Sequence, residues 1–396
     1  MDCDVLVVGG GIHGVGVAQA AAAAGYGVVL LEQDALAAGT SSRSSKLIHG
    51  GLRYLESAEL SLVRESLRER ELLLRLAPDL VHRQKFFIPI YQHTSRAAWV
   101  IRAGLSLYAL LAGMGEYNRF RTLERNEWQQ LDGLETDGLR HVFQYWDAQT
   151  DDTLLTRAVM ESACELGATL LCPARFEFAE ISRGGCDVSY SSQGSIGRCR
   201  AATVVNAAGP WARRIANQFS PAVPDIDVEN VQGAHLELPG TIEKGCYYVE
   251  APRDRRAVFV MPWKHGRTLL GTTEQPFGGD PGAVEVLPEE VSYLLEVYQY
   301  YFPGRPTDVL DQWAGLRVLP TAHGSSFKRS RETQLPVDNE TTPRVVSIFG
   351  GKLTGYRATA TRVVELLKRT LPGVKALADT SKLPLTTPEK EKLGSD

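Results

Sequence analysis

The stretch DVLVVGGGIHGVGVAQAAAAAGYGVVLLE, Asp4–Glu32, decides the fold. A short apolar run leads into glycines at the G-x-G-x-x-G spacing. An alanine-rich helical segment, a second apolar run and a glutamate follow. Strand, tight turn, helix, strand and acid together make a complete dinucleotide-binding unit. The presence of both strands and the acid favours this unit over an ordinary glycine-rich turn between a strand and a helix.

Each motif position has its own expected role. Gly9 permits the tight turn, and Gly14 allows the helix to pack closely on the strand. Gly11 lets the backbone approach a pyrophosphate, which the unpaired N–H groups of the helix N-terminus bind. Glu32 is expected to accept hydrogen bonds from ribose hydroxyls.

The next segment, GTSSRSSKLIHGGLRYL at Gly39–Leu55, indicates which dinucleotide is bound. It combines small hydroxyl residues with cationic residues, and apolar residues are interleaved with them, which fits poorly with a flexible surface loop. A second polar loop beside a Rossmann unit suits FAD, which has a pyrophosphate, a ribityl chain and a large ring. The cofactor contacts predicted in this segment are Thr40, Ser41, Ser42, Ser45 and Lys46.

The block TSSRSSKLIHGGLRYLE, Thr40–Glu56, resembles the corresponding segment of the FAD-dependent glycerol-3-phosphate dehydrogenases. These belong to the wider D-amino-acid-oxidase-like flavoprotein family. The resemblance runs from about Asp4 to about Leu371. Further matching segments follow in the family's order: LRERELLLRLAP (Leu67–Pro78), VVNAAGPW (Val204–Trp211), VFVMPW (Val258–Trp263), LLGTTE (Leu269–Glu274), GLR (Gly315–Arg317) and SIFGGKLTGYR (Ser347–Arg357).

The resemblance implies an α/β fold: a Rossmann-like FAD-binding domain with an inserted antiparallel-sheet substrate domain. The predicted FAD-binding domain is discontinuous and comprises residues 1–86, 146–225 and 315–372. The substrate-binding and membrane-facing domain comprises residues 87–145 and 226–314, and residues 373–396 are expected to form a loose tail. The family commonly adds a C-terminal helical domain, most of which this sequence is expected to lack.

Composition excludes several classes of function. A net charge of −4 without a long basic tract argues against nucleic-acid binding. The six cysteines contain no C-x-x-C pair, which argues against zinc and a disulfide framework and fits a reducing cytoplasm. No carboxylate and histidine cluster has the spacing of metal ligands, so no metal is expected.

The segment RAAWVIRAGLSLYALLAGMG, residues 96–115, is apolar but carries Arg102. Spanning a bilayer takes about 20 apolar residues, so an interfacial helix or a buried core helix is expected here. The family resemblance implies peripheral association with the cytoplasmic face of the membrane. The residues predicted to enter the headgroup region are Trp99, Ile101, Leu105, Tyr108 and Leu111, with Arg96, Arg102 and Arg119 at the edges.

Two further glycine-containing turns are expected to face the cofactor. Small residues around Gly209, in AAGPW, let backbone approach it closely. The run Gly350, Gly351, Lys352, Leu353 and Thr354 lies at a predicted helix start. Its N–H groups and the positive end of the helix dipole can stabilise negative charge that gathers at the flavin N1–C2=O edge.

A phosphate ester substrate requires cations, and arginine suits it because the planar guanidinium bonds two phosphate oxygens at once. The candidates are Arg53, Arg317, Arg331 and Lys352, which lie in or beside the matching blocks. Arg317 is the first choice and Arg331 the second, with Arg329 as the alternative to Arg331. Lys352 is expected to serve the substrate or the flavin.

His49 is the first choice as the base that takes the hydroxyl proton, because a histidine pKa of about 6.5 suits this role near neutral pH. A structural hydrogen-bonding role beneath the flavin ring is the alternative. Tyr54 either orients the substrate or packs as an apolar residue.

Together these residues predict a membrane-associated flavoenzyme. It would oxidise sn-glycerol 3-phosphate to dihydroxyacetone phosphate by hydride transfer to flavin N5 and pass the electrons to a quinone. One alternative is an FAD-dependent oxidase or dehydrogenase that acts on another hydroxy acid, amino acid or phosphonate with oxygen. A second is a flavin-binding protein without turnover, against which His49, Arg317 and Lys352 argue.

Overall fold

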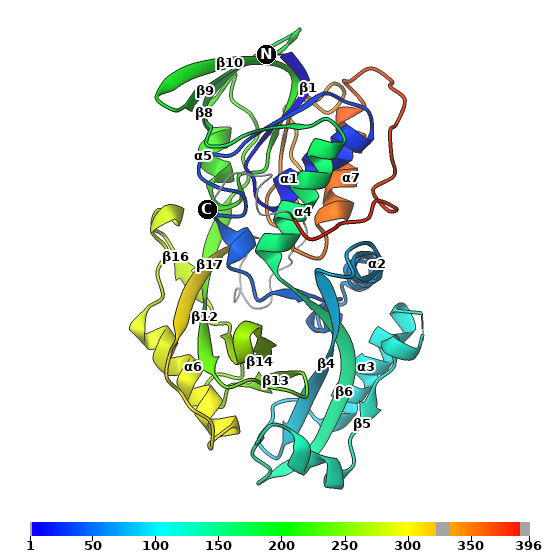
Figure 1. Ribbon diagram of the computed structural model, residues 1–396, viewed down its shortest axis with the longest axis vertical. Helices are drawn as coiled ribbons and strands as arrows, with labels where there is room; N and C mark the ends of the chain where they lie inside the picture. The colour runs from blue at the N-terminus through cyan, green and yellow to red at the C-terminus, as the bar shows by residue number, and fades with distance from the viewer. Residues whose placement is uncertain (1, 114, 322–332, 389–396) are drawn as a thin grey trace.

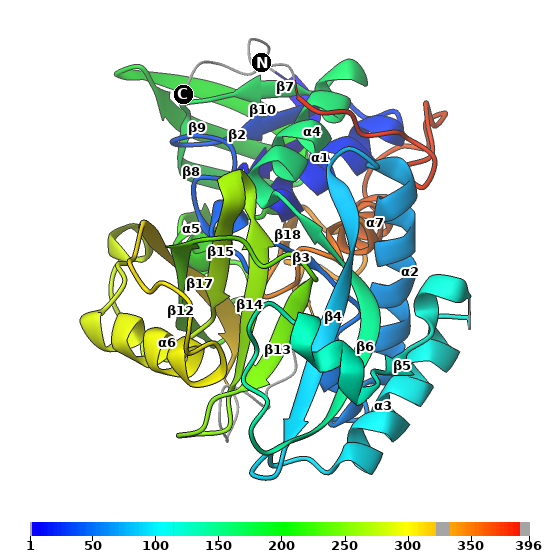
Figure 2. The same cartoon turned by 60° about the horizontal axis from the view of Figure 1, so that its bottom comes forward.

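The computed structural model describes residues 2–113, 115–321 and 333–388, which form two sheets with helices around them (Figures 1 and 2). In Figure 1 the first sheet and its helices occupy the upper half, and the long strands of the second sheet occupy the lower half. This mixed α/β architecture confirms the predicted fold class.

The first sheet has a parallel centre with the order β18-β10-β1-β2-β7. The antiparallel strands β8, β9 and the first half of β10 continue it, and β11 pairs with β8. Its strands are β1 (Asp2–Val8), β2 (Val28–Leu31), β7 (Thr169–Leu171), β8 (Arg175–Ser182), β9 (Gly185–Ser192), β10 (Ser195–Asn206), β11 (Phe219–Ser220) and β18 (Val345–Ser347).

Three helices, α1 (Ile12–Ala23), α4 (Asp152–Glu165) and α7 (Tyr356–Leu367), pack against the parallel strands. Along β1, Val5 and Val7 are buried in the cluster that these helices share. Leu6 and Val8 are buried in another cluster with residues of β8, β9 and β10. Because both faces of the strand are covered, β1 reads as a continuous apolar run instead of an alternation.

The second sheet has the order β16-β12-β15-β14-β13-β4-β6-β3, with β17 beside β12 and β5 beside β6. Most of its pairs are antiparallel, which agrees with the antiparallel sheet that the resemblance implies for the substrate domain. Its strands are β3 (Leu47–Ile48), β4 (Val81–Tyr91), β5 (Arg121–Thr122), β6 (Leu139–Thr150), β12 (Val228–Pro239), β13 (Cys246–Glu250), β14 (Ala257–Trp263), β15 (Arg267–Gly271), β16 (Gln275–Phe277) and β17 (Asp311–Pro320).

The remaining helices lie around this sheet or join the two sheets. Helix α6 (Pro288–Tyr301) packs its buried residues against the strands around β12, and α2 (Leu60–Leu76) lies between β4 and α7. Helix α3 (Ala98–Leu111) lies at the outer edge of the molecule beside β6 (Figures 1 and 2), and α5 (Ala212–Ala216) is a short helix after β10.

The sheets suggest where the predicted domain division lies. The predicted boundaries at residues 86/87, 145/146 and 314/315 fall inside β4, β6 and β17, all strands of the second sheet. A boundary that crosses a strand separates residues bonded in one ladder. We therefore propose that the division into cofactor and substrate domains follows the two sheets.

The C-terminal segment differs from the predicted loose tail. The backbone N–H of Leu377 donates to Ala23 O at 2.8 Å, and that of Leu385 donates to Leu76 O at 2.7 Å. The Leu385 side chain is only 4% exposed and belongs to the core shared by α1, α4 and α7. Residues 373–388 are thus held by backbone hydrogen bonds and one apolar anchor, which composition alone does not reveal.

Candidate active site

The first glycine turn lies between the carboxyl end of β1 and the start of α1. Gly9 has a φ of +108°, and a Cβ there would lie 2.8 Å from the carbonyl oxygen of Ala207. A Cβ at Gly14 would overlap the carbonyl oxygen of Gly9. Glycine is therefore needed at both positions for the turn to pack against α1 and the end of β10.

Gly11, in this turn, and Glu32, directly after β2, both line a cavity. A Cβ at Gly11 would lie 3.1 Å from the Ser41 hydroxyl oxygen, which accepts the N–H of Ile12 at 2.9 Å. The Glu32 carboxylate accepts the backbone N–H groups of Gly10 at 2.6 Å and Asp34 at 2.8 Å. Burial raises the Glu32 pKa, and these backbone donors oppose the rise. A ribose contact to Glu32 stays a prediction.

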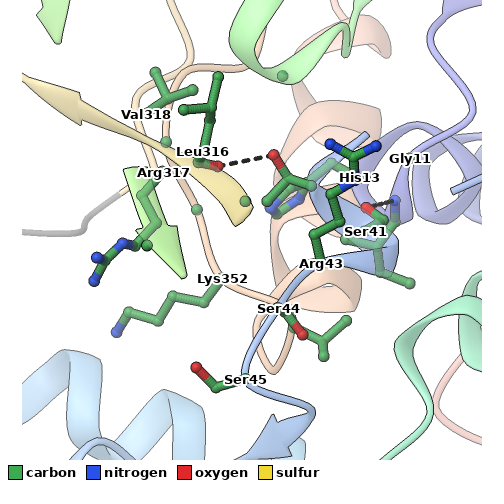
Figure 3. Close-up of a pocket in the computed structure, with 18 of the residues that line it drawn as sticks. Gly11, His13, Ser41, Arg43, Ser44, Ser45, Leu316, Arg317, Val318 and Lys352 are labelled. Carbon is green, nitrogen blue, oxygen red and sulfur yellow. Dashed lines mark hydrogen bonds between the residues drawn. The ribbon is translucent and has the colours of Figure 1, made fainter. Parts of the chain in front are cut away.

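The cavity has a volume of about 1350 Å³ and extends from the glycine turn to the second sheet. Figure 3 shows part of it, with Gly11, His13 and Ser41 on one side and Arg317 and Lys352 on the other. Its walls at the second sheet include side chains of β4, β6, β14 and β17.

The hydroxyl-rich segment forms one side of the cavity. The Thr40 hydroxyl donates to Leu316 O at 2.8 Å, which ties the segment to β17, and Ser45 lies beside the cavity with its hydroxyl 2.9 Å from His235 Nε2. Ser42 and Lys46 are not among the residues that line the cavity. The buried Lys46 ammonium instead pairs with Asp152 at 2.6 Å and donates to Ser42 O. In this structure Ser42 and Lys46 therefore hold the segment in place without lining the cavity.

The turn at residues 350–354 also lines the cavity and precedes α7. Gly350 and Gly351 have φ values of +77° and +100°, and a Cβ at Gly351 would overlap the His13 imidazole. Leu353 and Thr354 also line the cavity. Gly209, with a φ of +54°, lines the cavity as well.

The cations predicted for the substrate come from separate elements and reach the same cavity. Arg53, Arg317 and Lys352 all line it. Figure 3 shows the Arg317 and Lys352 side chains extending toward the same side. Arg317 Nη2 donates to Thr273 O at 2.9 Å, which fixes one edge of its guanidinium. Arg329 and Arg331 lie outside the described residues.

His49 and Tyr54 also line the cavity. The backbone N–H of His49 donates to the Thr354 hydroxyl at 3.1 Å, so the two predicted cofactor and substrate segments are joined there. The Tyr54 ring is 7% exposed and packs in a core cluster with Leu47 and Leu67. The tyrosine thus serves apolar packing while one of its faces remains at the cavity.

Sequence reasoning missed His235, a buried residue of β12 at the cavity wall. Its ring stacks on Trp313 with a centroid distance of 5.6 Å, and burial, followed by the charges of Lys46 and Arg317, lowers its pKa to about 3. His235 is therefore neutral at physiological pH. The sequence around His235 indicates a strand with a buried face. It does not indicate that this strand borders the cavity.

His13 lies in the first turn of α1, directly after the glycine turn. It lines the cavity, and burial, followed by the charge of Arg362, lowers its pKa to about 4. Among the described residues, neither its Nδ1 nor that of His235 finds a hydrogen-bond partner. Buried polar atoms of this kind need a partner, and a polar cofactor in the cavity can supply one.

Helix α3 differs from the prediction in the face that it exposes. Leu105 and Tyr108, predicted to enter a membrane, are buried at 1% and 3% exposure, and Ile101 and Leu111 are partly buried. Trp99 and Leu110 are 73% and 63% exposed. The helix is apolar nearly all round, so packing decided which side is free. In the described part of the chain, no helix has the length and apolarity to cross a bilayer.

The cavity fits FAD in its backbone and its polar atoms. The glycine turns leave room at the start of α1 and before α7, where N–H groups can face a pyrophosphate and a flavin edge. The hydroxyl-rich segment supplies further polar groups between them.

Comparisons with known proteins agree with this fit. The sequence model of the FAD dependent oxidoreductase (DAO) family matches residues 4–360. Glycerol-3-phosphate dehydrogenase of Pseudomonas aeruginosa is 40% identical over 363 residues, covering 90% of this chain and 70% of that protein. D-erythritol 1-phosphate dehydrogenase of Brucella abortus is 36% identical over 375 residues, covering 93% and 74%.

Among solved structures, the glycerol-3-phosphate dehydrogenase from Bacillus halodurans complexed with FAD is similar, with a TM-score of 0.76 and 26% identity. The match covers 97% of this chain and 68% of that one. The glycine turns, the cavity and these similarities lead to one conclusion: the chain belongs to the FAD-dependent oxidoreductases of the DAO family and is an enzyme with FAD as its cofactor.

Proposed function

We propose that the enzyme oxidises sn-glycerol 3-phosphate to dihydroxyacetone phosphate and passes the electrons to a quinone. The observation that carries the proposal is the entry of Arg317 and Lys352 into the cavity that also holds His49 and the glycine turn. Two cations from distant segments at one wall suit a phosphate dianion, while the neighbouring wall suits the cofactor. The similarity to proteins named glycerol-3-phosphate dehydrogenase supports the same substrate.

Each residue at the cavity has its own role in the proposed reaction. FAD, when bound, would supply the oxidising chemistry as the acceptor of a hydride from the substrate. His49 takes the hydroxyl proton, since a neutral imidazole is a suitable base near neutral pH. Arg317, Lys352 and Arg53 bind and orient the phosphate, and Tyr54 bounds the space for the carbon chain. The backbone of residues 350–354 stabilises negative charge that develops at the cofactor.

The surface of α3 supports a membrane-bound acceptor. Trp99, Val100 and Leu110 are exposed apolar residues of this helix, and Val100, Gly104 and Leu107 line the cavity. An apolar helix that reaches both the surface and the cofactor cavity can lie in the lipid interface and admit a quinone ring. We propose peripheral contact with the cytoplasmic face of the membrane through this helix.

Anaerobic titration of the purified enzyme tests the substrate. Glycerol 3-phosphate is expected to bleach the flavin absorbance stoichiometrically, and glycerol at the same concentration is expected to bleach it poorly. Equal bleaching by both compounds would contradict a phosphate-binding role for the cations. Rapid turnover with oxygen in place of a quinone would favour the oxidase alternative.

A longer polyol phosphate is the second candidate substrate, because the relative from Brucella abortus is named D-erythritol 1-phosphate dehydrogenase. D-erythritol 1-phosphate in the same titration distinguishes the two. Faster reduction by this compound than by glycerol 3-phosphate would assign the longer substrate to the same cations.

A further inference from the structure

The backbone N–H groups of His49 and Gly50 each donate to a side-chain hydroxyl. The N–H of His49 donates to Thr354 Oγ1 at 3.1 Å, and that of Gly50 donates to Tyr108 Oη at 2.8 Å. Thr354 belongs to the cofactor turn, whereas Tyr108 belongs to α3. The backbone that carries the proposed base is therefore fixed from two independent elements.

Tyr108 is itself held by a buried chain of hydrogen bonds. Its hydroxyl donates to the Asp147 carboxylate at 2.8 Å, and Arg70 Nη1 donates to the same carboxylate at 2.6 Å. Arg70 also donates to Trp146 O at 3.0 Å and to Asn118 Oδ1 at 2.7 Å. The Tyr108 hydroxyl accepts from Gly50 and donates to Asp147, which Arg70 also holds. Such a network fixes the position of the hydroxyl more firmly than a single hydrogen bond would.

All three members of this chain are nearly inaccessible. Tyr108 and Asp147 are each 3% exposed, and Arg70 is 1% exposed. Burial, followed by the charge of Asp147, raises the Tyr108 pKa well above its ordinary value, so the hydroxyl keeps its proton. The Arg70–Asp147 ion pair is buried as well, and a buried ion pair is by itself weak evidence for stability.

The space around Gly50 shows how closely the backbone beside His49 packs against Tyr108. A Cβ at Gly50 would overlap the Tyr108 hydroxyl and the Leu67 side chain. Asp147 lines the cavity on the same side, and its Oδ1 lies 3.3 Å from the Gly50 nitrogen. The backbone beside His49 thus has little freedom to shift away from the cavity.

We propose that Tyr108, supported by Asp147 and Arg70, is a positioning residue that holds His49 at the substrate hydroxyl. The proposal rests on the function above, in which His49 takes the proton. It assigns to α3 a second role, because its exposed side faces the surface while Tyr108 on its buried side fixes the base.

Tyr108→Phe tests the proposal with little change in shape, since it removes only the hydroxyl. Misplacement of a catalytic group lowers kcat strongly, so a fall of about ten- to hundred-fold is expected, with KM for glycerol 3-phosphate and FAD content unchanged. Tyr247→Phe is the matched control. Tyr247 is also buried, and its hydroxyl donates to Asp132 at 2.8 Å in a separate core cluster. Its kcat is expected to equal that of the wild type.

A double-mutant cycle with His49→Ala separates positioning from general damage. If Tyr108 acts through His49, adding Tyr108→Phe to His49→Ala lowers kcat no further. Additive losses, or an unchanged kcat in Tyr108→Phe, would overturn the positioning role while leaving the proposed function intact. An unchanged kcat in His49→Ala would instead overturn the base assignment on which the inference rests.

A second variant covers the case in which Tyr108→Phe does not fold. Asn118→Ala removes the outer acceptor of Arg70 and leaves Tyr108 in place. A smaller fall in kcat at constant KM is then expected, and it should also vanish in the His49→Ala background. A kcat equal to that of the wild type would overturn the proposal.

Discussion

The ammonium nitrogen of Lys352 lies 3.7 Å from the centre of the Tyr54 ring. A cation over an aromatic face is attracted by the ring quadrupole. Because the ring is held in a core cluster, it restricts the position of the lysine ammonium group in the cavity. Two segments separated by about 300 residues of sequence thereby form one wall of the proposed substrate site.

The glycine turn gives a prediction for cofactor binding. Gly11→Val places a side chain toward the cavity, where its nearest protein neighbour is the Ser41 hydroxyl. The protein is expected to fold but to purify without FAD, as measured by absorbance and circular dichroism. Gly14→Val is expected to prevent folding, because its Cβ meets the Gly9 carbonyl. Gly304→Ala, with nothing within 4 Å of the added Cβ, serves as the control. Full FAD content in Gly11→Val would contradict the assignment.

The anion site gives a prediction for specificity. Each charge-assisted hydrogen bond to a phosphate is worth roughly 1.5–3 kcal/mol, so Arg317→Ala should lower kcat/KM for glycerol 3-phosphate by about ten- to hundred-fold. Arg317→Lys should recover only part of it, since lysine lacks the planar guanidinium. FAD content should stay constant. Arg140→Ala, at an exposed position of β6, is the control. An unchanged ratio of activities on glycerol 3-phosphate and glycerol would place the anion site elsewhere.

Helix α3 gives a prediction for membrane binding. Trp99→Ser and Leu110→Ser should weaken sedimentation with anionic vesicles, by at most about 1.5–3 kcal/mol per side chain. Ile196→Ser removes an equally exposed apolar residue, 67% accessible, from the distant β10, and should have no effect. Leu105→Ser should destabilise the fold because Leu105 is core. Equal vesicle binding by all three surface variants would refute contact through α3.

The buried histidines predict the pH dependence of stability. The pKa values of His235 and His13 are lowered by burial to about 3 and about 4, below the value of about 6.5 for an unfolded chain. Between these limits the unfolded state binds more protons, so stability is full above pH 6.5 and falls as the pH is lowered, by up to about 1.4 kcal/mol per pH unit for each histidine. Urea unfolding from pH 8 to pH 5 measures this slope, which His235→Gln should reduce. A slope identical to that of the wild type would show that His235 is not buried as a neutral group.

The C-terminal segment gives a prediction for stability. Leu385→Ala removes a side chain that is 4% exposed in the core beside α1, and it should cost about 2–5 kcal/mol in the free energy of unfolding. Leu377→Ala, at a position that is 65% exposed, is the matched control and should change little. Equal stability of both variants would instead support the prediction from composition that this segment is a loose tail.

Much of the fold could be read from local sequence patterns. The sequence of residues 57–77, 153–167 and 288–301 predicts three helices, and the structure has α2, α4 and α6 in these places. These patterns are legible because the period of apolar residues follows the secondary structure. The glycine spacing is equally informative, because close backbone approach allows no other residue.

The site was predictable in part. The segments that carry His49, Arg317 and Lys352 could be chosen because each combines polar chemistry with a recognisable block. His235 and Asp147 could not, since a buried polar residue in a strand resembles any other interruption of an apolar run. Their position at the cavity depends on which strands pair, which is not encoded locally.

The sequence by itself determined the dinucleotide-binding unit, the FAD-type segment beside it and the identity of the cationic candidates. Only the tertiary structure decided which side of α3 is buried, where the C-terminal segment lies, and that Tyr108 and Thr354 meet the backbone at His49 and Gly50. The physical reason is the range of the interactions. Backbone conformation and apolar period are set by near neighbours. The buried side of a helix that is apolar nearly all round, and the partner of a hydroxyl, are set by elements distant in the chain.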